Sequence, residues 1–350
     1  MNYTRGPRQK FDFISCLGGY RIGFHGSGRR YRQRPPNPMS QPDSGIVPMP
    51  PERVGYQGEP GAFSSVAARL LCGSKAKLAP LPTFSDVFQS VANGKHDGAV
   101  IPIENTLHGS VLENYDLLLA AGLTITGEVY VRIVHNLICA PETRFSDIRK
   151  VYSHPVALNQ CLRLFEAHPA MEKVSFYDTA GSVKMLMEDH PPGAAAIASA
   201  EAAQIYGAKI VRRAIEDNPE NYTRFFLLQR SGLKQSKKKT GHIPGPYKTS
   251  LVFTVANVAG ALFRSLGAFA LRDISLARIE SRPLRGRPWE YMFYLDLGAH
   301  VNDPACANAI NHLRELADTL HILGCYPAAR LGSTKSKRGK TADKGNNLKK

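Results

Sequence analysis

Strand-like and helix-like segments alternate along the chain from Arg53 onwards, and this alternation limits the folds that the chain can adopt. Short apolar runs at Arg53–Gln57, 98–103 and Ala194–Ala198 indicate buried strands, and each precedes a segment whose apolar residues recur at helical spacing. Parallel strands are connected by helices, which cover the faces of their sheet. We therefore predict an α/β fold with a parallel or mixed sheet for residues 53–231.

A second, smaller unit follows residue 247. Strands are expected at 249–255, 274–279, 290–297 and 325–330, and helices at 259–271 and 304–320. This βαββαβ order is that of a ferredoxin-like domain. The predicted organisation is a disordered basic extension over 1–52, the α/β domain over 53–231, a basic linker over 232–247, the small domain over 248–331 and a disordered basic tail over 332–350.

Positive charge gathers in three segments of this 350-residue chain, whose formal net charge is +16. Lys and Arg outnumber Asp and Glu by nine to three in residues 1–53, by six to none in 230–248 and by seven to one in 332–350. The folded units are therefore close to neutral, and solvated tails explain the charge better than a nucleic-acid surface. We expect no nucleic acid and no membrane as partners, since no apolar run reaches the roughly 18 residues of a membrane span.

The cysteines and histidines show none of the spacings that bind metals. The six cysteines form no CxxC pair, and the eleven histidines form no HExxH motif. We predict no metal site and reduced thiols, which favour a cytoplasmic location. The basic, acid-poor residues 1–52 leave a plastid transit peptide as the alternative, although only four serines precede Glu52.

A hydroxyl and a guanidinium stand side by side at the start of a strand-like stretch, in the run Asn221-Tyr222-Thr223-Arg224-Phe225-Phe226-Leu227. A buried arginine is costly unless an anion partners it, and a threonine hydroxyl donates one hydrogen bond in a defined direction. The pair Thr223 and Arg224 therefore indicates a site that holds a carboxylate and acts on a neighbouring group. These residues leave open the alternative of a strand-edge arginine in a structural ion pair.

Four strand-to-helix junctions of the α/β unit carry small polar residues, at the kind of position where ligand sites form in α/β proteins. They lie at 55–61, 101–110, 153–161 and 178–181. Each junction also fits ordinary helix capping, and His154 fits either an acid–base or a structural role. Four such junctions together with Thr223 and Arg224 favour a polar cleft.

These segments together resemble the prephenate dehydratase family, which includes the arogenate dehydratases. The resemblance covers residues 53–331 and rests on motifs that occur in the same order: Gly-x-x-Gly-x-x-Ser at Gly58, Gly61 and Ser64, then Pro102-Ile103-Glu104-Asn105, Gly109-Ser110-Val111, Ser153-His154-Pro155-x-Ala157, Gln160-Cys161, Asp178-Thr179-Ala180 and Asn221-x-Thr223-Arg224-Phe225. Thr106 departs from the family, which usually has serine there, but the hydroxyl is kept. The small unit resembles an ACT regulatory domain through Gly260-Ala261-Leu262 and Glu280-Ser281-Arg282-Pro283.

The resemblance implies an α/β fold with a two-lobed, periplasmic-binding-protein-like (type II) catalytic domain and a ferredoxin-like βαββαβ ACT domain. It implies loss of water and carbon dioxide from prephenate without a cofactor, with L-phenylalanine as the effector and a homodimer or homotetramer as the assembly. The open alternatives are arogenate as the substrate and a non-catalytic amino-acid-sensing module.

The resemblance also implies roles for individual residues. Thr223 would donate to the departing hydroxyl, Arg224 would orient a carboxylate or Thr223 itself, and Asn105 would belong to the same catalytic group. The implied substrate contacts are Gly58, Gly61, Ser64, Glu104, Thr106, Ser110, Ser153, His154, Ala157, Gln160, Asp178, Thr179, Ala180, Asn221 and Phe225. The implied phenylalanine site comprises Gly260, Ala261, Leu262, Glu280, Ser281, Arg282 and Pro283.

Overall fold

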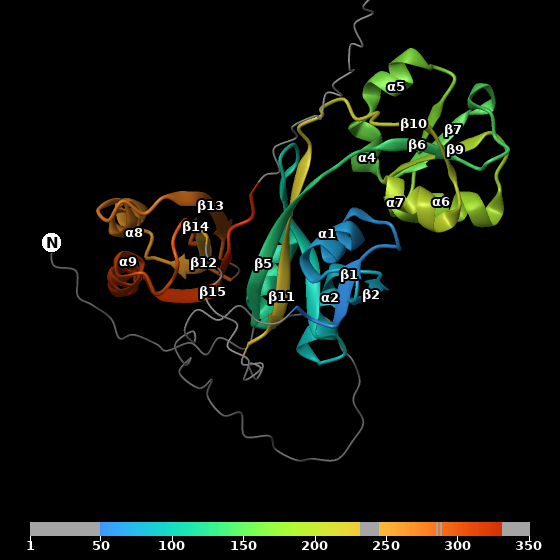
Figure 1. Cartoon of the computed structure of the whole chain (residues 1–350). Coiled ribbons are helices and arrows are strands. Elements are labelled where there is room, and N and C mark those ends of the chain that lie inside the picture. Colours follow the sequence, from blue (N-terminus) through green and yellow to red (C-terminus); the bar gives the residue numbers. More distant parts are fainter. Residues whose placement is uncertain (1–49, 232–244, 285, 288, 331–350) are drawn as a thin grey trace, which may run out of the picture.

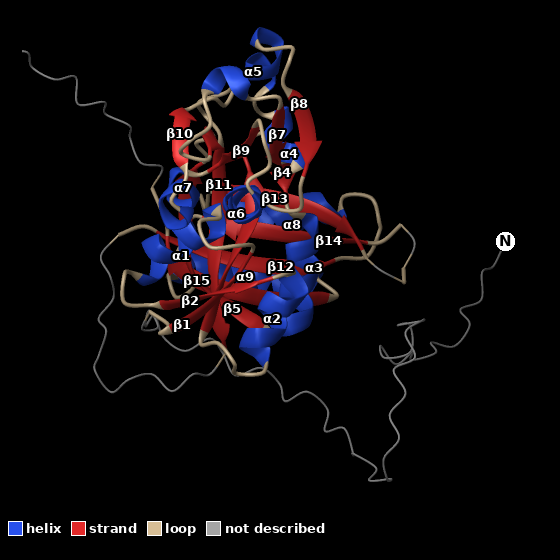
Figure 2. Ribbon diagram, turned by 90° about the vertical axis from the view of Figure 1, so that its right-hand side faces the viewer, coloured by secondary structure: helices blue, strands red, loops and turns tan. Residues whose placement is uncertain are grey.

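Three β-sheets organise the protein (Figure 1). The computed structural model describes residues 50–231, 245–284, 286–287 and 289–330. Residues 1–49 of the predicted basic extension, residues 232–244 of the predicted linker and the whole predicted tail over 332–350 lie outside these residues. Two sheets form the lobes of an α/β domain and the third forms the small domain. Figure 2 shows the second lobe at one end of the molecule, with the first lobe and the small domain at the other.

The first lobe is built on a mixed sheet with the strand order β2-β1-β3-β11-β5, in which β4 pairs with β3. Strand β1 runs parallel to β2 and β3, whereas β11 runs antiparallel to β3 and β5. The elements of this lobe are β1 (Arg53–Gln57), α1 (Phe63–Cys72), β2 (Lys77–Leu81), α2 (Phe84–Ala92), β3 (Gly98–Asn105), β4 (Gly109–Ser110), α3 (Leu112–Ala121), β5 (Leu123–Arg132) and β11 (Tyr222–Arg230).

The second lobe has the strand order β10-β6-β9-β7-β8, again a mixed sheet. Two of its helices start at side-chain caps: Asp178 accepts from Gly181 N at 2.7 Å before α6, and Ser199 accepts from Ala202 N at 3.0 Å before α7. The elements are β6 (Asn136–Cys139), a 3₁₀ turn (Phe145–Asp147), β7 (Lys150–Ser153), α4 (Pro155–Asn159), α5 (Leu162–Ala167), β8 (Glu172–Ser175), α6 (Thr179–Asp189), β9 (Ala194–Ala198), α7 (Ala200–Tyr206) and β10 (Lys209–Arg212).

Two crossing segments join the lobes, one from β5 to β6 and the other from β10 to β11. They are hydrogen-bonded to each other, since Ile133 N donates to Asn221 O at 2.8 Å and Ile215 N donates to His135 O at 2.9 Å. Two α/β lobes linked by paired crossings give the predicted type II arrangement. The fold class predicted for the large unit is therefore confirmed.

The small domain is an antiparallel sheet with the order β13-β14-β12-β15, and α8 and α9 pack against each other on it. The predicted βαββαβ order is confirmed, although the last strand begins at Thr319 rather than at 325 because α9 ends at Leu316. The elements are β12 (Tyr247–Thr254), α8 (Ala261–Ala270), β13 (Leu276–Pro283), β14 (Tyr291–Leu297), α9 (Pro304–Leu316) and β15 (Thr319–Pro327).

The face of the small sheet that carries no helix packs on the first lobe, where β15 lies against β5. Tyr294 and Tyr326 of the small domain share one apolar core with Ile125 and Phe226 of the first lobe. Gly324 permits the close approach, because a Cβ there would lie within 2.1 Å of Ile125 O. The first sheet is thus covered by α1 on one face and, on the other, by α2, α3 and the small domain.

Candidate active site

Strand β11 presents Thr223 and Arg224 on opposite faces of the first sheet, because successive side chains of a strand alternate. Phe225, two positions from Thr223, packs in the core beneath α1. Phe226 lies on the other face, where its ring centroid is 4.7 Å from the Arg224 guanidinium carbon. The hydroxyl and the guanidinium that are adjacent in the sequence therefore face different surroundings.

Thr223 is held by Asn105, at the end of the neighbouring strand β3. Oδ1 of Asn105 accepts from the backbone amides of Leu107 and His108 at 2.9 and 3.0 Å, which fixes the orientation of the amide group. Nδ2 consequently faces Thr223 Oγ1 at 2.9 Å and Asn221 Oδ1 at 2.8 Å. The Thr223 oxygen is thus an acceptor, and its hydrogen has no acceptor among the described residues.

Asn221 adds a second unused donor to this group. Its side chain is fully buried, and its Nδ2 has no partner within the described part of the chain. A buried amide without a hydrogen bond is costly, so a ligand that supplies an acceptor is favoured there. The structure therefore brings together three predicted residues, Asn105, Asn221 and Thr223, with donors left for a ligand.

Thr106 fastens the loop that carries Asn105. Its hydroxyl donates to Glu220 O at 2.9 Å and accepts from Tyr222 N at 3.0 Å. Both hydrogen-bonding directions are used within the protein, so this arrangement gives Thr106 a role in holding Asn105 next to β11 rather than a free donor for substrate.

Arg224 lies in a buried cluster of charges between the first lobe and the small domain, and is only 4% exposed. Its Nη1 is 2.6 Å from Asp296 Oδ2 and its Nη2 is 2.6 Å from Glu128 Oε2, while Lys248 Nζ reaches Glu128 Oε1 at 2.8 Å. Burial disfavours the charged guanidinium, but attraction to Asp296, Tyr326 and Glu128 outweighs it and raises the pKa of Arg224. We call Arg224, Glu128, Asp296 and Lys248 the interdomain ion cluster.

This placement corrects the expectation for Arg224. The structure does not place the guanidinium where it could orient Thr223 or a substrate carboxylate, because strand alternation turns it to the opposite face. The anions that partner Arg224 belong to the chain itself, as in the alternative of a structural ion pair.

Glu104 and Ser110 also face the small domain. Glu104 Oε2 lies 3.5 Å from Arg278 Nε, and Ser110 Oγ donates to Glu280 Oε2 at 2.7 Å. Glu104 and Asn105 are successive residues of β3, so their side chains point to opposite sides of the sheet. These two predicted substrate contacts are thus separated from Thr223.

The two lobes touch at the turn between β1 and α1. A Cβ on Gly61 would lie 2.5 Å from Ala202 Cα, and Ser199 Oγ donates to Gly61 O at 2.6 Å. A Cβ on Gly58 would lie 2.8 Å from Asp178 Oδ2. Both glycines also have positive φ, +104° and +90°, which side chains disfavour. The predicted residues Gly58, Gly61 and Asp178 therefore meet across the lobes.

Asp178 and Glu59 form the polar part of this contact. Burial raises the pKa of the Asp178 carboxyl, while backbone amides, including that of Glu59, favour its charged form. Glu59 in turn accepts from Tyr177 OH at 3.2 Å and pairs with Lys184 at 3.3 Å. Sequence reasoning missed Glu59, Tyr177 and Lys184. An acidic residue inside the Gly58–Gly61 turn was the available signal.

Predicted residues of the second lobe serve mostly within that lobe. Ser153 is fully buried and donates to Ile197 O at 2.6 Å. His154 caps α4 by accepting from Val156 N at 3.2 Å, and burial lowers its pKa. Ala157 and Ala180 are core residues of the second lobe, and Thr179 is the half-buried first residue of α6. The remaining predicted contacts lie in the first lobe, where Phe225 is a core residue and Ser64 is buried in the first turn of α1.

Gln160 leads to a residue that the sequence did not single out. Its Oε1 is 2.7 Å from His135 Nε2, on the crossing segment between β5 and β6. The His135 ring meets Phe63 edge-on at 5.8 Å, and its Nδ1 has no partner among the described residues. Burial lowers the pKa of His135, so the imidazole is neutral with an unused nitrogen at the junction of the lobes.

A pocket of about 320 Å³ opens at the start of α8 in the small domain. It is lined by Gly260, Ala261 and Leu262 of the first predicted phenylalanine motif, and by apolar side chains that include Tyr291 and Phe293. Gly260 caps the helix with φ +77°. We call this the α8 pocket.

The second predicted phenylalanine motif is divided by strand alternation. In the β13–β14 pair, Ser281 lies opposite Phe293 and therefore on the face of the α8 pocket. Glu280 and Arg282 lie on the other face, which packs on the first lobe, where Arg282 pairs with Asp116 at 2.8 Å. The structure thus brings only part of Glu280–Pro283 to the face of Gly260–Leu262.

Neither a metal-binding cluster nor a membrane-spanning helix occurs among the residues that the structure describes. Among those residues, no cluster of three or more His, Cys, Asp or Glu side chains has the proximity to hold a metal ion. None of their helices combines the length and the apolar character that crossing a membrane requires.

The sequence matches the family model for prephenate dehydratase over residues 54–232. It is 40% identical over 287 residues to arogenate dehydratase/prephenate dehydratase 2, chloroplastic, of Arabidopsis thaliana, which covers 79% of this chain and 72% of that protein. The structure of prephenate dehydratase from Arthrobacter aurescens in complex with L-Phe superposes with a TM-score of 0.71 at 30% identity, covering 79% of this chain and 90% of the other. A structure described as GqqA, a novel type of quorum quenching acylase, matches with a TM-score of 0.71 at 34% identity, covering 79% of this chain and 98% of the other.

A two-lobed α/β domain with preorganised donors at its hinge, joined to a small domain with a pocket of its own, is the architecture of an enzyme that a second ligand can control. The matched model spans half of the chain, and the Arabidopsis relative aligns along most of its length. The chain belongs to the prephenate dehydratase family. It is accordingly a carbon–oxygen lyase of the hydro-lyase class.

Proposed function

We propose that this protein converts prephenate to phenylpyruvate in phenylalanine biosynthesis. The bond between the ring and its carboxylate breaks, so that carbon dioxide departs and the electron pair of the bond completes the aromatic ring, while the C4 hydroxyl takes up a proton and departs as water. The protein has to hold the substrate carboxylates and stabilise the departing oxygen. Aromatisation supplies the driving force.

The observation that carries this proposal is the state of Thr223. Asn105 Nδ2 occupies a lone pair of the Thr223 oxygen at 2.9 Å, so the hydroxyl hydrogen is left to point at a ligand. A donor fixed in this way stabilises the departing hydroxyl without reorganising during the reaction. Asn221 Nδ2 is the second donor of the same group and a candidate to bind a carboxylate.

Three variants test this role. Thr223→Ala is expected to lower kcat by about 10²–10³, as loss of a preorganised donor does in other enzymes, whereas Thr223→Ser keeps a hydroxyl and is expected to retain most turnover. Thr124→Ala removes a threonine hydroxyl near the opposite end of the same sheet, where it is hydrogen-bonded to Ser231, and is the matched control. Nearly full turnover by Thr223→Ala would rule out the proposed role.

Arogenate is the second candidate substrate, and the name of the Arabidopsis relative covers both. It carries an amino group where prephenate has a keto oxygen. Purified protein assayed with each compound in parallel decides between them by the ratio of kcat/KM. If well-folded protein turns over neither compound, the alternative function of a non-catalytic amino-acid-sensing module is favoured.

We further propose that the α8 pocket binds L-phenylalanine and that this binding changes turnover. Its volume of about 320 Å³ and its apolar lining suit one aromatic amino acid. Ala261→Trp fills the pocket and is expected to abolish phenylalanine binding measured by calorimetry. Unchanged binding by this variant would place the effector elsewhere.

The assembly and the location are further parts of the proposal. Phe263, Leu271 and Trp289 of the small domain are 80%, 80% and 79% exposed, which supports a homodimer or homotetramer associated through this domain. Sedimentation velocity of Phe263→Asp is expected to show smaller particles than the unaltered protein. The chloroplastic relative favours the plastid alternative over the cytoplasm, and imaging of a fluorescent fusion of the full chain distinguishes the two.

A further inference from the structure

Arg278 of the small domain reaches the hairpin that carries Asn105. It belongs to β13, and its side chain is 8% exposed. Its Nη2 donates to Ser110 Oγ at 2.5 Å and to Glu280 Oε2 at 3.0 Å, and its Nε lies 3.5 Å from Glu104 Oε2. One guanidinium therefore holds both strands of the β3–β4 hairpin, since Glu104 is in β3 and Ser110 in β4.

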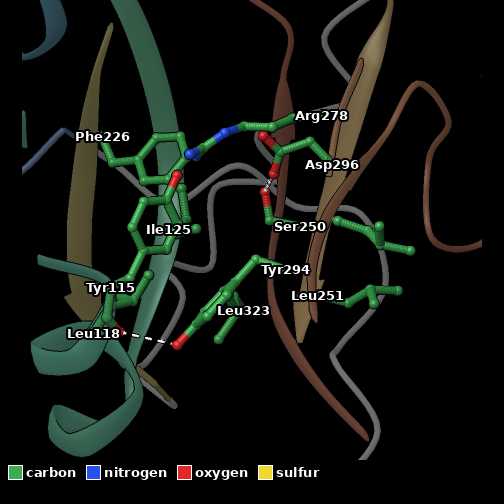
Figure 3. Close-up of a pocket in the computed structure, with 11 residues that line it drawn as sticks. Tyr115, Leu118, Ile125, Phe226, Ser250, Leu251, Arg278, Tyr294, Asp296 and Leu323 are labelled. Carbon is green, nitrogen blue, oxygen red and sulfur yellow. Dashed lines mark hydrogen bonds between the residues drawn. The ribbon is translucent and has the colours of Figure 1, made fainter. Parts of the chain in front are cut away.

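The same guanidinium lies over the ring of Tyr115, 4.6 Å from its centroid, at the start of α3. Figure 3 shows Arg278 extending across the domain boundary toward Tyr115 from the side that carries Ser250 and Asp296. The void between these residues has a volume of only about 10 Å³, about the space of one water molecule. The contact is therefore tightly packed, so a shift of Arg278 has to move the hairpin.

The hairpin held by Arg278 leads directly to Thr223. In the β3–β4 pair, Glu104 lies opposite Ser110, and Asn105 is the next residue of β3. Asn105 Nδ2 donates to Thr223 Oγ1 at 2.9 Å. Two side-chain contacts, Arg278 to Glu104 and Asn105 to Thr223, thus connect Arg278 to the proposed donor hydroxyl through two neighbouring residues of β3.

Strand β13 also leads to the α8 pocket. Its side chains alternate in exposure, with Arg278 and Glu280 toward the first lobe and Ser281 on the opposite face. Ser281 lies across from Phe293, which lines the α8 pocket. A ligand that moves β13 from the pocket face therefore moves the guanidinium on the other face.

We propose that Arg278 is a positioning residue that sets the β3–β4 hairpin, and with it Asn105 and Thr223, according to whether the α8 pocket is occupied. This inference rests on the proposed function. It attributes the effect of phenylalanine on turnover to the face of β13 that carries Arg278 and Glu280, and not to the interdomain ion cluster alone.

The test compares Arg278→Met with Arg287→Met, because Arg287 lies on the same β13–β14 hairpin, is 55% exposed and pairs with Glu290. Turnover of prephenate and arogenate is measured with and without saturating phenylalanine, and phenylalanine binding is measured by calorimetry. Arg278→Met is expected to lower kcat about ten- to hundredfold, to bind phenylalanine and to lose the response of turnover to it. Arg287→Met is expected to behave as the unaltered protein does.

Arg278→Lys keeps the charge but cannot contact three partners at once, so it is expected to restore solubility and melting temperature without restoring the phenylalanine response. If Arg278→Met does not fold, this variant decides the question. An unaltered phenylalanine response in a folded Arg278 variant overturns the inference and leaves the proposed function intact. Unaltered protein that turns over neither compound refutes the proposed function and this inference with it.

Discussion

Replacing Arg224 by methionine should destabilise the protein through the charge left behind at Asp296. Without the guanidinium, Glu128 keeps Lys248 Nζ at 2.8 Å. Asp296, which is 6% exposed, keeps only the hydroxyl of Ser250 among the described residues. Removing one partner of a buried ion pair costs about 3–5 kcal/mol, because the remaining charge stays desolvated. We therefore expect the free energy of unfolding of Arg224→Met to fall by about that amount.

The assay is urea unfolding followed by far-ultraviolet circular dichroism. The double variant Arg224→Met/Asp296→Asn is expected to lose less than Arg224→Met alone, by roughly 1–3 kcal/mol, because no unpaired charge remains. Arg287→Met removes an exposed arginine that pairs with Glu290 and is the control, with an expected change within about 1 kcal/mol.

Unfolding of Arg224→Met like that of the control would show that no costly unpaired charge is left at Asp296. A double variant that is no more stable than the single one would show the same. A raised KM for prephenate with unchanged stability would show that the guanidinium serves the substrate and that the interdomain ion cluster has been misassigned.

Two glycines give sharper tests of contacts between parts of the chain. Gly61→Ala should lower kcat/KM, because its Cβ would lie 2.5 Å from Ala202 Cα and keep the lobes apart. Gly73→Ala is the control, because Gly73 also has positive φ (+77°) but a Cβ there would have nothing within 4 Å. It therefore shows only the cost of roughly 1–2 kcal/mol of placing an alanine in this backbone conformation. Equal kcat/KM in the two variants would contradict the contact between the lobes at Gly61. Gly324→Ala should weaken the packing of the small domain on Ile125 O, seen as a lower melting temperature and a smaller phenylalanine response. A melting temperature and response like those of the unaltered protein would mean that this approach is unimportant.

Most helices and strands could be predicted from the sequence, because hydrophobic periodicity is a local property. The strand Arg53–Gln57 and the βαββαβ order of the small domain agree with the structure. After the predicted junction at 153–161 the structure has two short helices, α4 and α5, and β2 and α2 were not predicted. Strand β2, with sequence KLAPL, contains Pro80 and lies at the edge of its sheet, where the apolar pattern of a central strand is absent.

The sequence by itself determined that Thr223, Asn105 and Asn221 carry polar groups at strand ends, and their motifs identified the family. Only the tertiary structure decided which groups meet, because the partners are far apart in the chain. Asn105 reaches Thr223 over 118 positions, and Arg224 reaches Asp296 over 72. The alternation that turns Thr223 and Arg224 apart is a local property of any strand. The face of the first sheet on which the small domain packs is not determined locally, since it depends on how three sheets pack together. This packing places Asp296 next to Arg224.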